Sequence, residues 1–243
     1  MRIDKLLANA GYGSRKDVKK MIKARIVQVD GEVVTDPKTN VDQDKQEVTV
    51  NGEQVIYKEH IYLMMNKPAG FLSATEDQFQ KTVLDLLEPE DLVYHPFPAG
   101  RLDKDTEGLL LLTSDGQLAH QLTAPKKHVP KTYYAKIIGS VTQEDAEKFR
   151  SGIRLDDGYV TKPALLETIH SGEISEVYVT ITEGKYHQIK RMFASVGKKV
   201  KYLKRLKIGT LQLDPALQTG EYRELTDEEL EQLRSSSVFT HER

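Results

Sequence analysis

Residues 100–116 read GRLDKDTEGLLLLTSDG, a loop rich in charge that runs directly into an apolar stretch. The four leucines at 109–112 predict a strand, and the residues at 115–122 have helical periodicity. Outward from this stretch, strand-like and helical runs alternate irregularly. The other strand-like runs lie at 61–65, 132–138, 164–169, 176–182 and 199–208, and the other helical runs at 82–87, 142–150, 187–196 and 226–234. This order favours an α+β fold, with a mixed, mainly antiparallel β-sheet flanked by helices, over a doubly wound fold.

The loop before the leucines carries three carboxylates, on Asp103, Asp105 and Glu107. A calcium loop that started at Asp103 would need a glutamate at its twelfth position, where Ser114 stands, and the leucine strand fills the half that should continue the loop. A pair of carboxylates could also hydrolyse glycosides. The chain has no Trp to supply an aromatic sugar platform, which disfavours that alternative.

The first 56 residues follow a different pattern, two short helices and then hairpins. Residues 3–10 have helical spacing, and Ser14 with Asp17 three residues on predicts the N-cap of a second helix. The pairs Asp-Gly at 30–31 and Asn-Gly at 51–52 stand between short strand-like runs and predict tight hairpin turns. The sequence therefore predicts a small separate domain at the N-terminus.

The stretch RIDKLLANAGYGSRKDVKKMIKARIVQVDGEVV, residues 2–34, closely resembles the S4-type RNA-binding module, and the match continues to about residue 56. The resemblance implies that the start of the second helix faces RNA, because a helix N-terminus and nearby cations can both hold phosphates. The residues that it assigns to RNA binding here are Ser14, Arg15, Lys16, Lys19 and Lys20.

Charge is unevenly distributed, although the formal net charge is only -2. Residues 1–25 carry eight Lys and Arg against two Asp, and residues 181–210 carry nine against one Glu. Four further lysines lie at 126–136 with no acidic residue among them. Three basic blocks in a nearly neutral chain indicate a surface that is directed toward a phosphate backbone.

Composition excludes several other classes. No apolar stretch approaches the roughly 18 residues of a membrane span, so we expect no membrane partner. The first residues lack the apolar core of a signal peptide, and we expect a cytoplasmic protein. With no Cys, disulfides, a thiolate nucleophile and sulfur-ligated zinc sites are excluded. We see no dimerisation motif and expect a monomer.

Four motifs, in order, resemble those of the pseudouridine synthases. GRLDKDTEGLLLLTSDG resembles their signature stretch, in which the Asp of R-L-D is essential. The other three are a K-P-x-G within residues 66–70, a K-x-Y at 131–133 and a G-x-x-H-Q-I at 184–189. A late L-x-R-x-x-I-G run at 203–209 agrees as well. With the N-terminal module, the order is that of the RsuA type, which modifies uridines of small-subunit ribosomal RNA. We place the S4-like domain at 1–58 and the catalytic domain at 61–243.

The resemblance implies that Asp103 is the catalytic carboxylate and that Lys190 is the cation that keeps it ionised. The wider superfamily has Arg at this position. Lys offers a point charge where Arg could bind bidentately, so the neighbouring Arg191 stays an alternative partner. Tyr133 is expected to lie against the target base. The residues of this domain that are expected to bind RNA are Arg101, Lys131, His187, Arg191 and Arg205.

We therefore expect cofactor-free and metal-free isomerisation of a specific uridine in 16S ribosomal RNA, with a small-subunit assembly intermediate as the substrate. Two alternatives stay open. One is the same chemistry on a uridine of large-subunit ribosomal RNA or transfer RNA. The other is a catalytically silent RNA-binding factor for ribosome assembly.

Overall fold

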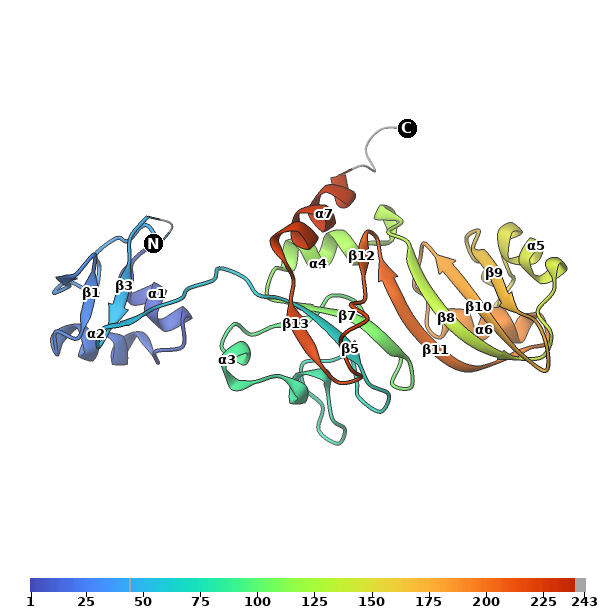
Figure 1. The fold of residues 1–243 in the computed structure, drawn as a ribbon, viewed down its shortest axis with the longest axis horizontal. Helices are drawn as coiled ribbons and strands as arrows, with labels where there is room; N and C mark the ends of the chain where they lie inside the picture. Colours follow the sequence, from blue (N-terminus) through green and yellow to red (C-terminus); the bar gives the residue numbers. More distant parts are fainter. Residues whose placement is uncertain (44, 239–243) are drawn as a thin grey trace. The chain divides into compact units, whose positions relative to one another are not determined.

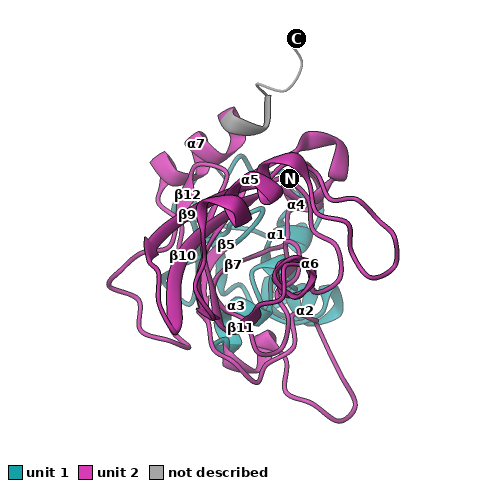
Figure 2. Cartoon of the chain, turned by 90° about the vertical axis from the view of Figure 1, so that its right-hand side faces the viewer, with its two compact units in different colours: residues 1–61, 87–95 teal, residues 62–86, 96–243 magenta. Residues whose placement is uncertain are grey.

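The structure is a computed structural model that describes residues 1–43 and 45–238, with the side chains of 236–238 left out. The chain divides into two compact units (Figure 2). Unit 1 comprises Met1–Ile61 and Leu87–His95, and unit 2 comprises Tyr62–Leu86 and Pro96–Arg243. The sequence places a domain boundary at residues 58–61. That these residues separate two independently folding domains stays a prediction.

Unit 1 begins with two helices, α1 (Ile3–Asn9) and α2 (Arg15–Lys23), which pack on a small antiparallel sheet in the order β2-β1-β3-β4 (Figure 1). Its strands are β1 (Val27–Val29), β2 (Glu32–Val33), β3 (Val48–Val50) and β4 (Glu53–Gln54), and Leu87–His95 adds the short helix α3 (Pro89–Leu92). The apolar stripes of both helices meet the strands in one core, which includes Ile3, Leu7, Val18 and Val27.

Local sequence signals explain how unit 1 folds. Ser14 caps α2 through a capping box, in which its hydroxyl accepts from the amide of Asp17 and the Asp17 carboxylate accepts from the amide of Ser14. At both hairpin turns the two central residues have positive φ, 52° and 83° at residues 30–31 and 54° and 82° at 51–52. Asp, Asn and Gly tolerate this conformation, so the predicted turns are confirmed.

Unit 2 contains one large sheet in the order β13-β5-β7-β11-β8-β10-β9. The bounds are β5 (Tyr62–Lys67), β7 (Glu107–Thr113), β8 (Lys131–Ile138), β9 (Leu165–His170), β10 (Ile174–Ile181), β11 (Lys199–Ile208) and β13 (Tyr222–Glu224). Two short strands, β6 (Phe97–Pro98) and β12 (Leu211–Gln212), pair with β7 and β11. Among the strand pairs of the described residues, only β7 and β11 run parallel, so the predicted mixed, mainly antiparallel sheet is confirmed.

Helices pack on both halves of this sheet, one pair near β5 and β7 and another near β9 and β11 (Figure 1). The elements are η1 (Val83–Leu86), α4 (Gly116–Thr123), η2 (Pro125–Lys127), α5 (Gln143–Ser151), α6 (Gln188–Ser195) and α7 (Asp227–Val238). α4 packs beside α7 over β5 and β7, whereas α5 packs against β9 and α6 against β11. No helix of the described chain combines the length and apolar character that crossing a membrane requires.

The leucine run forms the central strand β7, between β5 and β11. Leu109 to Leu112 are all fully buried, because both faces of this strand are covered, and Leu109 and Leu111 pack with Met64 and Leu118. The strand β8 instead alternates: Tyr133 is buried, whereas Tyr134 is partly exposed. The period of two therefore places the two tyrosines on opposite faces, as predicted.

The sequence interpretation differs from the structure mainly in short elements. The run at 82–87 is a single 3₁₀ turn, Val83–Leu86, rather than a full helix. The elements α3, β6, β12 and β13 have no counterpart in the prediction, because two to four residues give too few repeats for periodicity to show.

Candidate active site

Asp103 lies in a tight turn between β6 and β7, which we call the Asp103 loop (residues 101–106). The amide of Thr106 donates to the carbonyl of Asp103 at 3.1 Å and closes the turn. Next to it, the buried Ser73 hydroxyl accepts from the amide of Leu102 and donates to its carbonyl, at 3.1 and 3.0 Å. The Asp103 side chain itself is 27% exposed, so a fixed backbone presents an accessible carboxylate.

Lys67, at the end of β5, supports the Asp103 loop from inside. Its side chain is fully buried, and its Nζ donates to the carbonyls of Pro68, Asp103, Lys104 and Thr106 at 2.9, 3.3, 3.3 and 3.0 Å. Burial lowers the pKa of Lys67 to about 8. Lys67 is the lysine of the K-P-x-G motif, and its place in that motif is the one signal in the sequence that points to a role in the site, a role that was not predicted for it.

Lys190, in the first turn of α6, lies between two carboxylates of the Asp103 loop. Its Nζ is 3.1 Å from Asp103 Oδ2 and 2.5 Å from Asp105 Oδ1. Partial burial of the ammonium lowers its pKa, but the bonds to Asp105 and Asp103 outweigh that effect and raise the pKa of Lys190 above its ordinary value. The ammonium is therefore charged, and it offsets the repulsion between the two carboxylates.

The neighbouring Arg191 points elsewhere. Its Nε donates to Asp156 Oδ1 at 2.6 Å, and its Nη2 is 2.7 Å from Asp157 Oδ2. These two bonds raise the pKa of the Arg191 guanidinium and lower that of the Asp157 carboxyl. Of the two basic residues that the sequence left open, it is Lys190 that lies beside Asp103.

The turn that leads into α6 is organised by a buried acid. Glu183 accepts from the amide group of Gln188 at 2.9 Å and from the hydroxyl of Tyr159 at 2.6 Å. The Gln188 side chain in turn accepts from the amide of Lys185 at 2.8 Å. These bonds fix His187 in the left-handed region, with φ of 49°, and its Nε2 is 3.8 Å from Asp103 Oδ1.

Tyr133 and Arg205 stand opposite each other on β8 and β11, and Arg205 in turn stands opposite Gly108 on β7. With strands roughly 4.8 Å apart, this row puts Tyr133 about 10 Å across the sheet from the start of β7. Within the described residues, the Tyr133 hydroxyl has no hydrogen-bond partner. Arg205 is buried, and its Nε donates to the carbonyl of Leu109 at 2.8 Å, whereas its Nη2 has no partner in the described chain.

The other predicted RNA-binding residues lie in three environments. Lys131 is half-buried and donates to the carbonyl of Val129 at 2.8 Å; burial and the charge of Arg205 lower its pKa to about 8. Arg101 is exposed, and no described residue pairs with it. In unit 1, Ser14 forms the N-cap of α2. The five residues that are expected to bind RNA there are all exposed: Ser14, Arg15, Lys16, Lys19 and Lys20.

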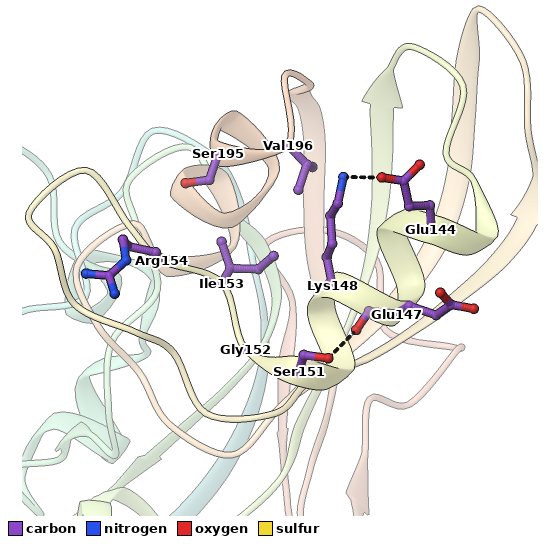
Figure 3. Close-up of a pocket in the computed structure, with 9 residues that line it drawn as sticks. All are labelled: Glu144, Glu147, Lys148, Ser151, Gly152, Ile153, Arg154, Ser195 and Val196. Atoms are coloured by element: carbon purple, nitrogen blue, oxygen red, sulfur yellow. Dashed lines mark hydrogen bonds and ion pairs between the residues drawn. The ribbon is translucent and has the colours of Figure 1, made fainter.

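A surface hollow lies away from these residues, between the C-terminal ends of α5 and α6 (Figure 3). Its lining includes Glu144 and Lys148, which pair with each other at 2.6 Å, and none of Asp103, Tyr133 and Lys190 lines it. Among the described residues, no three His, Asp or Glu side chains are grouped so that they could hold a metal ion.

The site thus combines a partly exposed carboxylate with a charged amine 3.1 Å from it. Tyr133, whose phenol has no hydrogen-bond partner among the described residues, stands two strands away from the start of β7. A carboxylate can act as a nucleophile or as a base, and the ammonium beside it offsets its negative charge. The geometry therefore suits chemistry at an electrophilic carbon or an acidic proton.

Comparison with known proteins identifies relatives of both units. The family model described as RNA pseudouridylate synthase matches residues 61–195, and the S4 domain model matches residues 1–46. The chain is 61% identical to "Uncharacterized RNA pseudouridine synthase YtzG" of Bacillus subtilis (strain 168), over 95% of this chain and 97% of the relative. It is 40% identical to "Ribosomal small subunit pseudouridine synthase A" of Escherichia coli (strain K12), over 95% and 98%. A solved structure titled "Crystal structure of pseudouridylate synthase" aligns with a TM-score of 0.68 at 38% identity, covering 96% of this chain and 99% of that one.

Proposed function

Because this chain belongs to the RNA pseudouridylate synthases and carries an S4 domain, we propose that it isomerises one specific uridine of small-subunit (16S) ribosomal RNA to pseudouridine. Relatives named for the small ribosomal subunit support the choice of RNA, since they are 40 to 43% identical over 95% of the chain. The observation that carries the chemistry is the pair of Asp103 and Lys190, an accessible carboxylate with its own cation.

The isomerisation is balanced without a cofactor. The bond from uracil N1 to ribose C1′ breaks, the base turns, and a bond from C5 to C1′ forms; one proton leaves C5 and one is taken up at N1. A carboxylate can start this sequence by attack on the nucleoside or by removal of a proton, and we assign that role to Asp103. Lys190 supplies the cation that pairs with this carboxylate, 3.1 Å away.

We assign two further roles by position. Tyr133 offers a ring face to the target base, and its hydroxyl, without a partner among the described residues, is available to assist the final loss of the proton from C5. A base inside folded RNA has to leave the stack before it can react, and Arg101, the exposed first residue of the Asp103 loop, supports the vacated position. The S4 unit holds the RNA through phosphates along α2. We further propose that the enzyme acts as a monomer on an assembling small subunit.

Pseudouridine mapping tests this function. Early small-subunit particles, large-subunit ribosomal RNA and transfer RNA are each incubated with the wild-type chain, and new pseudouridines are read as carbodiimide-dependent stops of reverse transcription. We expect one new stop, in small-subunit RNA. A new stop only in the other RNAs would refute the substrate, and no stop in any RNA despite tight binding would identify a silent assembly factor.

A matched pair of variants tests the residue. Asp103→Asn should abolish the stop and leave RNA affinity unchanged. Asp105→Asn removes the other carboxylate bound to the same lysine, two residues away, and should keep most of the turnover. Activity in Asp103→Asn, or equal loss in both variants, would contradict the assignment of Asp103.

A further inference from the structure

Two strongly exposed aromatic side chains lie on loops that are bonded to the Asp103 loop. Phe79 is 91% exposed and Tyr186 is 77% exposed; Tyr178, the other exposed aromatic residue of the described chain, is only 39% exposed. Phe79 buries almost no surface, so the hydrophobic effect gives folding little from it. Both residues belong to the unit that carries Asp103.

The loop that carries Phe79, residues 72–82, is held at its base and shaped at its tip. At the base, the amide of Leu72 donates to the carbonyl of Lys81, and the amide of Val83 donates to the carbonyl of Leu72, both at 2.9 Å. At the tip, the Asp77 carboxylate accepts from the amides of Phe79 and Gln80 at 2.9 and 2.8 Å. The backbone at Phe79 is therefore fixed while its ring is free.

This loop is fastened to the Asp103 loop at two points. Ser73 bonds both backbone groups of Leu102, directly before Asp103. Lys104, directly after Asp103, donates through its Nζ to the Gln80 side chain at 2.7 Å. Phe79 is thus linked to Asp103 through a single side-chain hydrogen bond, because Gln80 follows Phe79 in the chain and Lys104 follows Asp103.

Tyr186 is linked to the same carboxylate from the other side. Its ring stacks on that of His187, with centroids 3.8 Å apart and planes inclined by 19°, and His187 Nε2 is 3.8 Å from Asp103 Oδ1. The bonds of Gln188 to Lys185 and Glu183 fix the turn beneath. One face of the tyrosine is covered by the imidazole, and the side chain is still mostly exposed.

We propose that Phe79 and Tyr186 each stack on an RNA base that lies next to the target uridine, an inference that rests on the proposed function. Every base has a flat π face, so an exposed ring on a fixed backbone can hold it without regard to its identity, for about 1 to 3 kcal/mol per base. Exposed cations lie on the same loops, Arg101 and Lys104 on the Asp103 loop and Lys185 directly before Tyr186, and they match the phosphates between stacked bases. When the target base leaves the stack, the two rings cover the neighbours that it exposes.

The absence of Trp from the sequence allows a direct test. Phe79→Trp and Tyr186→Trp each introduce a single indole, and Tyr178→Trp on β10 serves as the control at an exposed aromatic position outside these loops. Each variant is titrated with a 12-nucleotide oligouridylate while indole emission is recorded. We expect strong quenching at positions 79 and 186 and none at 178. Unchanged emission at 79 and 186 at RNA concentrations that saturate wild-type binding, or no binding by the wild type, would overturn the proposal.

Affinity provides the second readout. Phe79→Leu keeps the apolar bulk but loses the π face, and it should weaken oligouridylate binding by roughly 5-fold to 100-fold, whereas Phe79→Trp should restore it. The dependence of affinity on salt should stay unchanged, because no phosphate contact is lost. Wild-type affinity in both Phe79→Leu and Tyr186→Leu would also overturn the proposal.

These results separate the inference from the proposed function. If the wild-type chain forms no pseudouridine in any RNA but the indoles at 79 and 186 are quenched, the enzymatic function fails and the stacking surface stands. If the wild type is active on small-subunit RNA and the leucine variants match it in affinity and turnover, the function stands and the stacking surface fails.

Discussion

The ammonium of Lys190 forms ion pairs with two carboxylates at the centre of the site. Lys190 bonds both Asp103 and Asp105, but Asp105 is 73% exposed whereas Asp103 is 27% exposed. Solvent screens the ion pair of Lys190 with Asp105 more strongly, so this pair contributes less energy than its shorter distance suggests. Partial burial raises the pKa of the Asp105 carboxyl, but Lys190 lowers it below its ordinary value, and Lys190 also places a positive charge 3.1 Å from Asp103.

Removal of this cation should lower turnover. Lys190→Met leaves the carboxylates of Asp103 and Asp105 without the ammonium that offsets their repulsion, so kcat on small-subunit RNA should fall by roughly 10-fold or more. Lys190→Arg keeps the positive charge and should keep most of the turnover. Arg191→Met, whose side chain pairs with Asp156 and Asp157, is the control and should keep wild-type turnover. A loss of turnover in Arg191→Met alone would reverse the assignment.

Lys67 predicts a dependence of stability on pH. Burial lowers its pKa to about 8 from an ordinary value of 10.5, so between these pH values the unfolded chain binds a proton that the folded chain does not. Stability therefore rises with pH in this window, by up to about 1.4 kcal/mol per unit. Below pH 8 both states hold the proton, and the folded state bears the full cost of burying the charge.

The comparison with Lys67→Met isolates this effect, since Lys131 contributes equally to both proteins. The free energy of unfolding, measured by urea titration at pH 7, 8, 9 and 10, should rise more steeply in the wild type than in the variant. A difference between the two proteins that stays constant over this range would mean that Lys67 does not titrate there.

At the scale of elements, the pairing of β7 with β11 depends on Gly108. Its φ is +98°, and an added Cβ would lie 2.2 Å from the carbonyl oxygen and 2.8 Å from the amide nitrogen of Arg205. Only glycine allows this parallel neighbour to approach so closely directly after the Asp103 loop. Strand packing therefore requires Gly108 of the signature stretch, in addition to any role that it has in the loop.

Gly108→Ala should thus destabilise unit 2 by at least about 2 kcal/mol, because a backbone overlap is added to the strain of positive φ. Gly220→Ala is the matched control, since Gly220 has a φ of +96° and no atom within 4 Å of the added Cβ. Thermal unfolding of both variants measures the difference. Equal destabilisation would show that φ alone, and not the approach of β11, sets the cost.

At the scale of the whole molecule, the net charge of -2 conceals basic segments in both units. The lysines of α2 in unit 1 stay exposed, whereas several basic residues of unit 2 have structural partners, among them Lys67 and Arg191. A count of basic residues therefore overstates the phosphate-binding surface of unit 2 more than that of unit 1. We infer that α2 supplies much of the salt-sensitive affinity for RNA.

Charge reversal in unit 1 tests this division. Lys16→Glu with Lys19→Glu should weaken RNA binding and reduce the slope of log Kd against log salt by roughly 2, one unit for each lost phosphate contact. Lys38→Glu with Lys45→Glu makes the same charge change elsewhere in unit 1 and should reduce both much less. Turnover at saturating RNA should persist in both variants. Identical slopes for the two variants would contradict an RNA-facing α2.

The features that could be predicted from the sequence are those that depend on contacts between residues close together in the chain. The capping box at Ser14, the two turns with positive φ and the opposite faces of Tyr133 and Tyr134 all follow from contacts over a few residues. The motif order identified the family, because each motif is local and its residues are fixed in spacing. The elements α3, β6, β12 and β13 escaped prediction, and the 3₁₀ turn at Val83–Leu86 was expected as a longer helix, because two to four residues give too few repeats for periodicity to show.

The contacts between residues far apart in the sequence could be read from the tertiary structure alone. Lys190 reaches a carboxylate 85 residues away, and Lys67 binds the carbonyl of Thr106 across 39 residues. Periodicity could place Lys190 and Arg191 on α6 but could not show which one faces the Asp103 loop, because that depends on how α6 packs against β11. It likewise could not show that four carbonyls converge on one buried amine. The physical reason is that sheet topology, and not local preference, brings these distant segments together.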